Sequence, residues 1–78
     1  MGIDAIIDVI RSPWKRLREK RGAALPGFRR YIYVSVRKRL VVVTEEDDNI
    51  VIVTSWSTSR DIRRLVESRV RRGVWVEE

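Results

Sequence analysis

The sequence predicts an α+β fold in one small domain: N-terminal helices, a three-stranded antiparallel β-meander, a C-terminal helix and a short edge strand. Two observations lead to it. Apolar residues recur at helical spacing near both ends of the chain, whereas the middle holds three runs of β-branched and aromatic residues separated by polar turns. The length of 78 residues fits a single domain, one so small that pairing with a second copy would add stability.

Two helices are expected before the sheet, in a helical region over residues 3–21. Isoleucines recur every three or four residues and predict a first helix over about residues 3–11. Pro13 interrupts this pattern because it lacks a backbone N–H. Ser12 followed by proline is typical of a helix start, so a second helix is expected over about residues 13–21.

A linker and three strands are expected in the middle of the chain. Residues 22–28, GAALPGF, contain two glycines and a proline, which favour a linker. The meander follows over residues 29–56, and its first run, RRYIYVSVR, alternates between two kinds of residue as a half-buried strand does. The runs LVVVTEE and IVIVTSW are apolar on both faces. We therefore expect these two strands inside the sheet, with helices or a partner subunit covering each face.

The stretch TSWSTSR, residues 54–60, leads into a helix expected over about residues 59–72, and residues 74–77 then predict a short edge strand. Thr58 followed three residues later by Asp61 resembles a capping box, which gives the hydroxyls a structural role. A functional interpretation is also open. Hydroxyls at a strand end, beside the free N–H groups of a helix start, can hold a phosphate.

The chain is strongly basic, with a net charge of +6 and a sequence pI near 10.8. Only three of its 17 basic residues are lysines, and arginine is the side chain that best matches phosphate and stacks on bases. This composition is typical of nucleic-acid binding. A thermophilic surface is a compatible alternative, because charged residues make up 36% of the chain, glutamine is absent and Asn49 is the only asparagine.

Several classes of site are excluded by missing residue types. The chain has no cysteine and no histidine, which excludes disulfides, zinc sites and Ser-His or Cys-His catalysis. Carboxylate-bound magnesium at the acidic run over residues 45–48 stays open as an alternative, but a solvated turn is favoured, so we expect no metal and no cofactor. No apolar run approaches the ~20 residues that cross a bilayer. The sequence therefore predicts a cytoplasmic protein with no membrane partner.

Aromatic residues offer a second candidate surface. Tyr31 and Tyr33 share one face of the first expected strand, with arginines on both sides. Exposed aromatic side chains among arginines are typical of surfaces that stack nucleic-acid bases. The alternative is that both tyrosines pack under a helix. Trp14, Trp56 and Trp75 are expected to be core or interface anchors.

Residues 9–58 resemble the barnase/colicin/RelE-like group of ribonucleases and toxins in the order of their elements and in three stretches, VIRSPW, RRYIYVSVRKRLVVV and NIVIVTSW. In that group, helices precede an antiparallel sheet, and a strand ending in hydroxyl-bearing residues lines the active surface. The resemblance implies an RNA substrate, cleavage by the ribose 2′-hydroxyl and an antitoxin-like protein partner. This chain differs by lacking histidine and by adding a helix and a strand after the sheet.

The resemblance also implies roles for particular residues. The catalytic candidates are Tyr31, Tyr33, Arg37, Thr54 and Ser55. Arginine would stabilise charge developing on the phosphoryl oxygens, and a tyrosine would orient or shuttle a proton. Apart from the resemblance, the basic residues of the first expected strand, the turn after it and the C-terminal helix are expected to bind nucleic acid: Arg29, Arg30, Arg37, Lys38, Arg39, Arg60, Arg63, Arg64, Arg71 and Arg72.

Three functional hypotheses follow. The first is a small basic protein that interacts with nucleic acid, RNA being favoured over DNA, with a toxin-like ribonuclease activity. The second is a non-catalytic DNA- or RNA-binding protein of the chromatin or regulator type. The third is an interaction module that forms a homodimer through the sheet or through the strand that contains Trp75.

Overall fold

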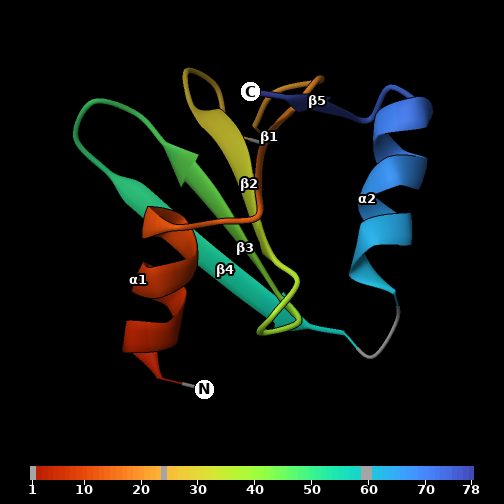
Figure 1. Ribbon diagram of the computed structural model, residues 1–78. Helices are drawn as coiled ribbons and strands as arrows, with labels where there is room; N and C mark the ends of the chain where they lie inside the picture. Colours follow the sequence, from red (N-terminus) through yellow and green to blue (C-terminus); the bar gives the residue numbers. More distant parts are fainter. Residues whose placement is uncertain (1, 24, 59–60) are drawn as a thin grey trace.

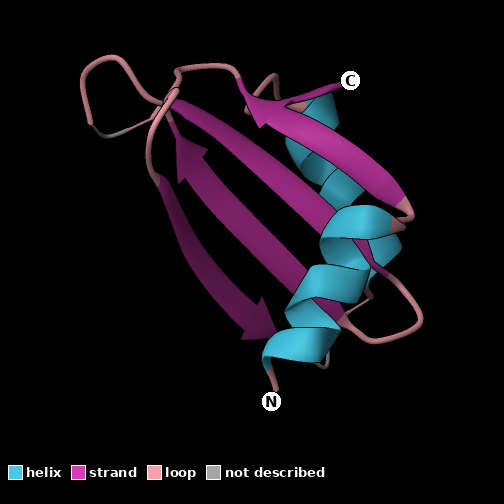
Figure 2. Cartoon of the chain, turned by 90° about the vertical axis from the view of Figure 1, so that its left-hand side faces the viewer, coloured by secondary structure: helices cyan, strands magenta, loops and turns pink. Residues whose placement is uncertain are grey.

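The computed structural model describes residues 2–23, 25–58 and 61–78. Its elements, in chain order, are α1 (Ile3–Arg11), β1 (Lys15–Glu19), β2 (Arg29–Ser35), β3 (Leu40–Glu46), β4 (Val51–Ser57), α2 (Ile62–Arg71) and β5 (Trp75–Glu77). The strands form one antiparallel sheet in the order β4-β3-β2-β1-β5 (Figure 1). Seen from the side of α1, that helix crosses in front of the sheet and α2 lies behind it (Figure 2). The expected α+β class is confirmed.

The expected second helix is wrong, because Lys15–Glu19 is the strand β1. The other four residues of β1 are charged, and exposed residues alternate with less exposed ones around the fully buried Leu17. This period of two is typical of a strand. The backbone of β1 pairs with β2 on one side and with β5 on the other. The sheet therefore contains β1 in addition to the three strands of the meander and the expected edge strand. The expected linker, residues 22–28, lies in the connection from β1 to β2, where no helix or strand is assigned to its described residues.

Strand β3 is the centre of the structure. Leu40 and Val42 point to the α1 side, Val41 and Val43 point to the α2 side, and all four are buried. The prediction that LVVVTEE is covered on both faces is confirmed. The same prediction for IVIVTSW is wrong, because this run forms β4 at the edge of the sheet and most of it is exposed.

Two apolar clusters fill the space between the sheet and its helices. The cluster on the α2 side consists of Leu17, Ile32, Val34, Val41, Val43, Ile62, Val66 and Trp75. The cluster on the α1 side consists of Val9, Tyr33, Leu40 and Val42, with Ile6, Ile10 and Tyr31 against it. Trp75 is anchored as expected: its indole N–H donates to Glu19 Oε2 at 3.1 Å, and Arg69 lies over its ring.

The ends of α2 have clear chemical causes. Its N-cap is Asp61, whose carboxylate accepts the Arg64 backbone N–H at 3.3 Å, so the expected cap at Thr58 is wrong. At the other end, Gly73 has φ 74° and its N–H donates to the Val70 carbonyl, which ends the helix. The chain then enters β5, the short edge strand that the sequence predicts. None of the described helices is long and apolar enough to cross a membrane.

Candidate nucleic-acid interface

Trp14 stands at the junction between α1 and β1. Its backbone N–H donates to the Val34 carbonyl at 2.8 Å, which fixes the residue beside the end of β2. Its side chain is 39% exposed, unlike Trp75, which is 3% exposed. Of the two expected roles, core or interface anchor, the core role is therefore wrong for Trp14, and its aromatic ring faces solvent where α1 and β1 meet.

Two cations lie close to the Trp14 ring. Lys15 Nζ is 5.5 Å from the ring centroid, and the Arg63 guanidinium carbon is 5.8 Å from it. Both distances lie within the ~6 Å range of cation–π attraction. Lys15 also pairs with Glu77, so its charge is partly neutralised. No described carboxylate lies within ion-pair distance of Arg63, which leaves its charge available to a ligand.

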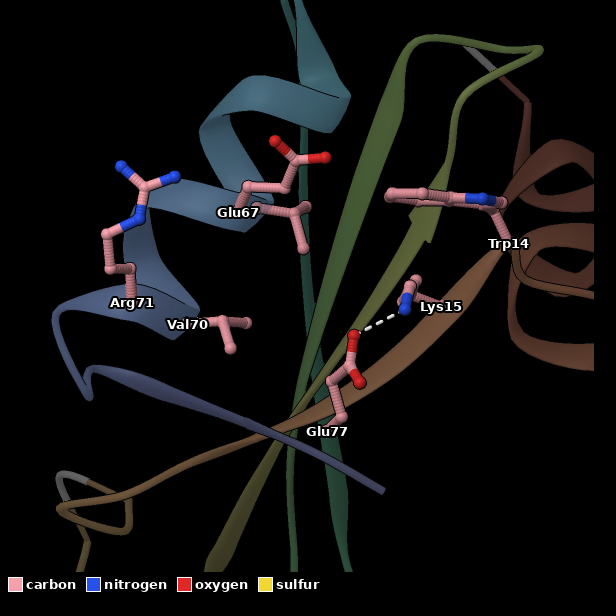
Figure 3. Close-up of a pocket in the computed structure, with 7 residues that line it drawn as sticks. Trp14, Lys15, Glu67, Val70, Arg71 and Glu77 are labelled. Carbon is pink, nitrogen blue, oxygen red and sulfur yellow. Dashed lines mark hydrogen bonds and ion pairs between the residues drawn. The ribbon is translucent and has the colours of Figure 1, made fainter.

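One side of Trp14 opens into a cavity of about 360 Å³, which we call the indole pocket. Figure 3 shows the Trp14 ring on one side of this pocket and the α2 residues Glu67, Val70 and Arg71 on the other. The charges around it are balanced, because its lining contains two cations, Lys15 and Arg71, and two carboxylates, Glu67 and Glu77. Lys15 and Glu77 form an ion pair at its lower edge. The pocket offers apolar contact to a flat ring and little net charge.

The second cavity that Trp14 lines is basic. It measures about 550 Å³, and its lining is Ser12, Pro13, Trp14, Ser35, Val36, Arg37, Lys38 and Arg63. This basic pocket has three cations and no carboxylate in its lining. Ser35 Oγ accepts the Lys38 backbone N–H at 3.2 Å and so helps to hold the turn between β2 and β3. A concave surface of one charge concentrates anions at its mouth.

The structure brings only some of the predicted basic residues together. Arg37, Lys38 and Arg63 meet at the basic pocket, although they come from two distant segments, and Arg71 lines the indole pocket. The charge of Lys38 is partly neutralised, because its Nζ lies 4.0 Å from Asp8 Oδ2.

The other predicted basic residues lie elsewhere. Arg29 and Arg30 are at the far end of β2, where Arg30 lies 3.9 Å from Glu45. Arg64 lines a separate cavity with Leu65, and Arg72 lines another with Lys20 and Arg21. Arg39 is exposed in the turn before β3. Arg60 lies outside the described residues.

The tyrosines do not form an open stacking surface. Tyr33 is 7% exposed and packs in the α1-side cluster, because its side of β2 is the side that α1 covers. Tyr31 is half-buried beside it. The Arg16 guanidinium carbon lies 4.5 Å from the Tyr31 ring centroid and 5.6 Å from that of Tyr33. The interpretation in which these rings pack under a helix fits the structure better.

The hydroxyl candidates do not converge either. Thr54 and Ser55 are adjacent in β4, so their side chains point to opposite faces of the sheet. Ser55 shares the α1 side with Tyr33, and Thr54 lies on the α2 side. At the start of α2 the Asp61 carboxylate accepts the Arg64 N–H, and residues 59 and 60 lie outside the described residues, so the expected phosphate cradle there stays a prediction. The structure therefore does not join the five catalytic candidates in one site.

The acidic turn after β3 has its own internal structure. Asp47 accepts the backbone N–H groups of Asn49 and Ile50, each at 2.8 Å. These bonds favour the charged form, so they lower the pKa of the Asp47 carboxyl below its ordinary value. Among the described residues, no group of acidic side chains is arranged to hold a metal ion.

Comparisons with protein-family models, with curated proteins and with solved structures return no match to this chain. The candidate interface is therefore supported by the geometry alone. Sequence reasoning missed its central residue. The available signal was that Trp14 lies between Lys15 and Pro13, the proline that interrupts the helical pattern.

Proposed function

We propose that this protein binds nucleic acid, and single-stranded RNA in preference to DNA, through the surface formed by Trp14, Arg37, Lys38 and Arg63. The observation that carries the proposal is an exposed indole that borders a pocket lined by three cations and no carboxylate. An aromatic platform beside a basic groove is the arrangement by which proteins hold single strands.

The two kinds of side chain would perform different tasks. A base stacks on the Trp14 ring from the indole pocket, where Val66 and Val70 offer further apolar contact. Such stacking contributes about 1–3 kcal/mol per base. Arg37 and Arg63 hold phosphates next to that base through paired N–H donors. Each phosphate contact releases condensed counterions, so the affinity falls as salt is added.

Single strands fit this surface better than duplexes. A base reaches the indole only when it is unstacked, whereas the bases of a duplex are stacked and paired. The preference for RNA comes from the resemblance to ribonucleases and toxins. It is supported by the exposed Ser12 hydroxyl in the lining of the basic pocket, since a hydroxyl is a suitable partner for a ribose 2′-hydroxyl.

The proposal assigns binding and no cleavage. Cleavage without histidine would require the candidate tyrosines and hydroxyls to meet at one phosphate. Tyr33 is buried beneath α1, and Thr54 lies on the opposite face of the sheet. The positions of these side chains therefore favour the non-catalytic hypothesis over a toxin-like ribonuclease.

A purely thermophilic role for the arginines is less well supported. Such surfaces rely on networks in which each cation meets an acid. Four ion pairs among the described residues involve Lys15, Arg18, Arg30 and Lys38, and no residue belongs to two of these four. Arg37 and Arg63 take part in none of these pairs, and they are the arginines of the basic pocket.

The test is a fluorescence-anisotropy titration with a labelled single-stranded RNA, the DNA of the same sequence and the corresponding DNA duplex, between about 50 and 200 mM salt. Each sample is also run on a denaturing gel. The proposal predicts the tightest binding to the RNA, steep weakening with salt and an intact strand. Strand cleavage would favour the ribonuclease hypothesis, and the absence of binding at low salt would refute the proposal.

A further inference from the structure

Strand β4 is a long edge strand without the usual protection. Residues 50–58, IVIVTSWST, contain no charge in a chain that is 36% charged. Val51 is 58% exposed, Ile52 43% and Val53 44%. Edge strands are normally shielded by lysine, proline, a bulge or short length. The opposite edge, β5, is only three residues long, whereas β4 pairs with β3 through seven consecutive residues without a bulge.

The backbone of β4 offers a regular row of free groups. At one end of the hairpin, the Asp47 N–H donates to the Ile50 carbonyl, and at the other the Thr58 N–H donates to the Arg39 carbonyl. Both bonds belong to the single register between β3 and β4. Antiparallel hydrogen bonding alternates along a strand, so the even-numbered residues of β4 bond to β3. Val51, Val53, Ser55 and Ser57 consequently direct their N–H and C=O groups outward.

The two ends of β4 carry opposite charges. The turn before it contains Asp47 and Asp48, and Arg39 lies beside its last residues. An antiparallel partner strand of the same sequence would set the acidic end of one copy against the basic end of the other. A parallel arrangement would set like charges together. The charge pattern therefore selects a second copy related by a two-fold axis.

We propose that two copies of this chain pair antiparallel through β4, about a two-fold axis at Thr54, and so join two five-stranded sheets into one. In this register Val53 is opposite the partner's Ser55 and Val51 is opposite the partner's Ser57, so all the outward backbone groups are matched. Ile52 is opposite the partner's Trp56 on the α2 side. That pair covers apolar area that neither helix of its own chain shields.

This dimer is distinct from the surface proposed for nucleic acid. Trp14 precedes β1, and the strand order separates β1 from β4 by two strands. Arg39 lines neither of the two pockets that contain Trp14. A failure of one proposal therefore leaves the other standing, and the two can be tested with separate variants.

Cysteine crosslinking tests the register, because the chain has no cysteine of its own. At a pair without mutual hydrogen bonds the Cα atoms lie about 4.5 Å apart, which a disulfide can span. Thr54→Cys should therefore give a covalent dimer on oxidation. The control is Val51→Cys, also exposed, whose copies would lie about 20 Å apart along the strands. Equal crosslinking of the two variants, or none at position 54, would overturn the proposed register.

Sedimentation equilibrium tests the association itself. The protein is expected to be dimeric, and Val53→Lys should raise the dimer dissociation constant by about tenfold or more, because it places two like charges beside the axis. Leu25→Lys is the matched control, since Leu25 is 42% exposed in the connection from β1 to β2, and the strand order places β3 between β2 and β4. A monomeric wild-type protein, or a Val53→Lys variant that dimerises as well as the wild type, would refute the dimer.

Discussion

The Arg63 guanidinium carbon lies 5.8 Å from the centroid of the Trp14 ring, although one residue belongs to the first turn of α2 and the other precedes β1. This contact joins the two halves of the chain at an exposed position. On its basic side, the same ring borders the pocket that Arg37 and Lys38 line. A ligand placed there would touch the N-terminal segment, the β2–β3 turn and α2 at once.

Removal of the indole should weaken RNA binding. Trp14→Ala is expected to cost about 1–3 kcal/mol of binding free energy, the usual contribution of one stacked base. Trp14→Phe should retain most of it, because a smaller aromatic ring still stacks. Anisotropy titrations with one labelled RNA measure both variants. Identical losses in the two would show that the ring does not act by stacking.

Salt dependence should report the phosphate contacts directly. Arg37→Gln is expected to reduce the slope of log affinity against log salt by about 1, since one fewer phosphate is neutralised. Arg72→Gln removes the same charge from a residue that lines a different cavity and should leave the slope unchanged. Titrations at several salt concentrations provide both slopes. A change of the same size in the two variants would indicate binding by net charge alone.

Tyr33 should be important for folding and unimportant for chemistry. It is buried in the α1-side cluster, so Tyr33→Ala is expected to lower the free energy of unfolding by about 3–5 kcal/mol, as for other large aromatic side chains in cores. Tyr33→Phe preserves the ring and should change stability by less than about 1.5 kcal/mol. Urea denaturation measures both. A folded Tyr33→Phe variant that lost RNA binding or cleavage would instead place the hydroxyl in the function.

Acid should remove the contribution that the ionised Asp47 carboxylate in the β3–β4 turn makes to the stability of the fold. The backbone N–H groups of Asn49 and Ile50 lower the pKa of Asp47 in the folded state. A lowered pKa stabilises the fold above the ordinary value of about 3.9, and this contribution is lost as the pH falls through the folded-state value. Asp47→Asn should therefore lose less stability than the wild type between about pH 5 and pH 2. Asp48→Asn is the control in denaturation experiments at each pH, because neither backbone bond ends on Asp48, and an equal change in the two variants would contradict the role of Asp47.

The sequence was informative where a pattern depends on one segment alone. The helical stripe of residues 3–11, the continuous apolar run of β3 and the glycine after α2 each predicted their element correctly. Residues 15–19 were misassigned because Trp14 and Leu17 lie at helical spacing. The strand state prevails there because β2 and β5 supply partners on both sides, and neither partner is visible locally.

The position of β4 could not be predicted from its composition. Its apolar run resembles that of β3, and an inner strand and a bare edge strand differ only in what lies beside them. The sequence predicted the cations of the candidate interface but not its tryptophan. Arg37, Lys38 and Arg63 were among the expected basic residues, but their meeting point depends on how α2 packs against the sheet. Trp14 was missed because exposure is a property of the fold.

The most direct test of the central claim compares two neighbouring arginines of α2. Arg63 lies beside Trp14, whereas Arg64 lines a separate cavity with Leu65. Arg63→Gln and Arg64→Gln change the net charge equally and lie on the same exposed helix turn. The account predicts that, in anisotropy titrations with single-stranded RNA, Arg63→Gln weakens binding markedly and Arg64→Gln leaves it close to wild type. Equal affinities for the two variants would contradict a binding surface centred on Trp14.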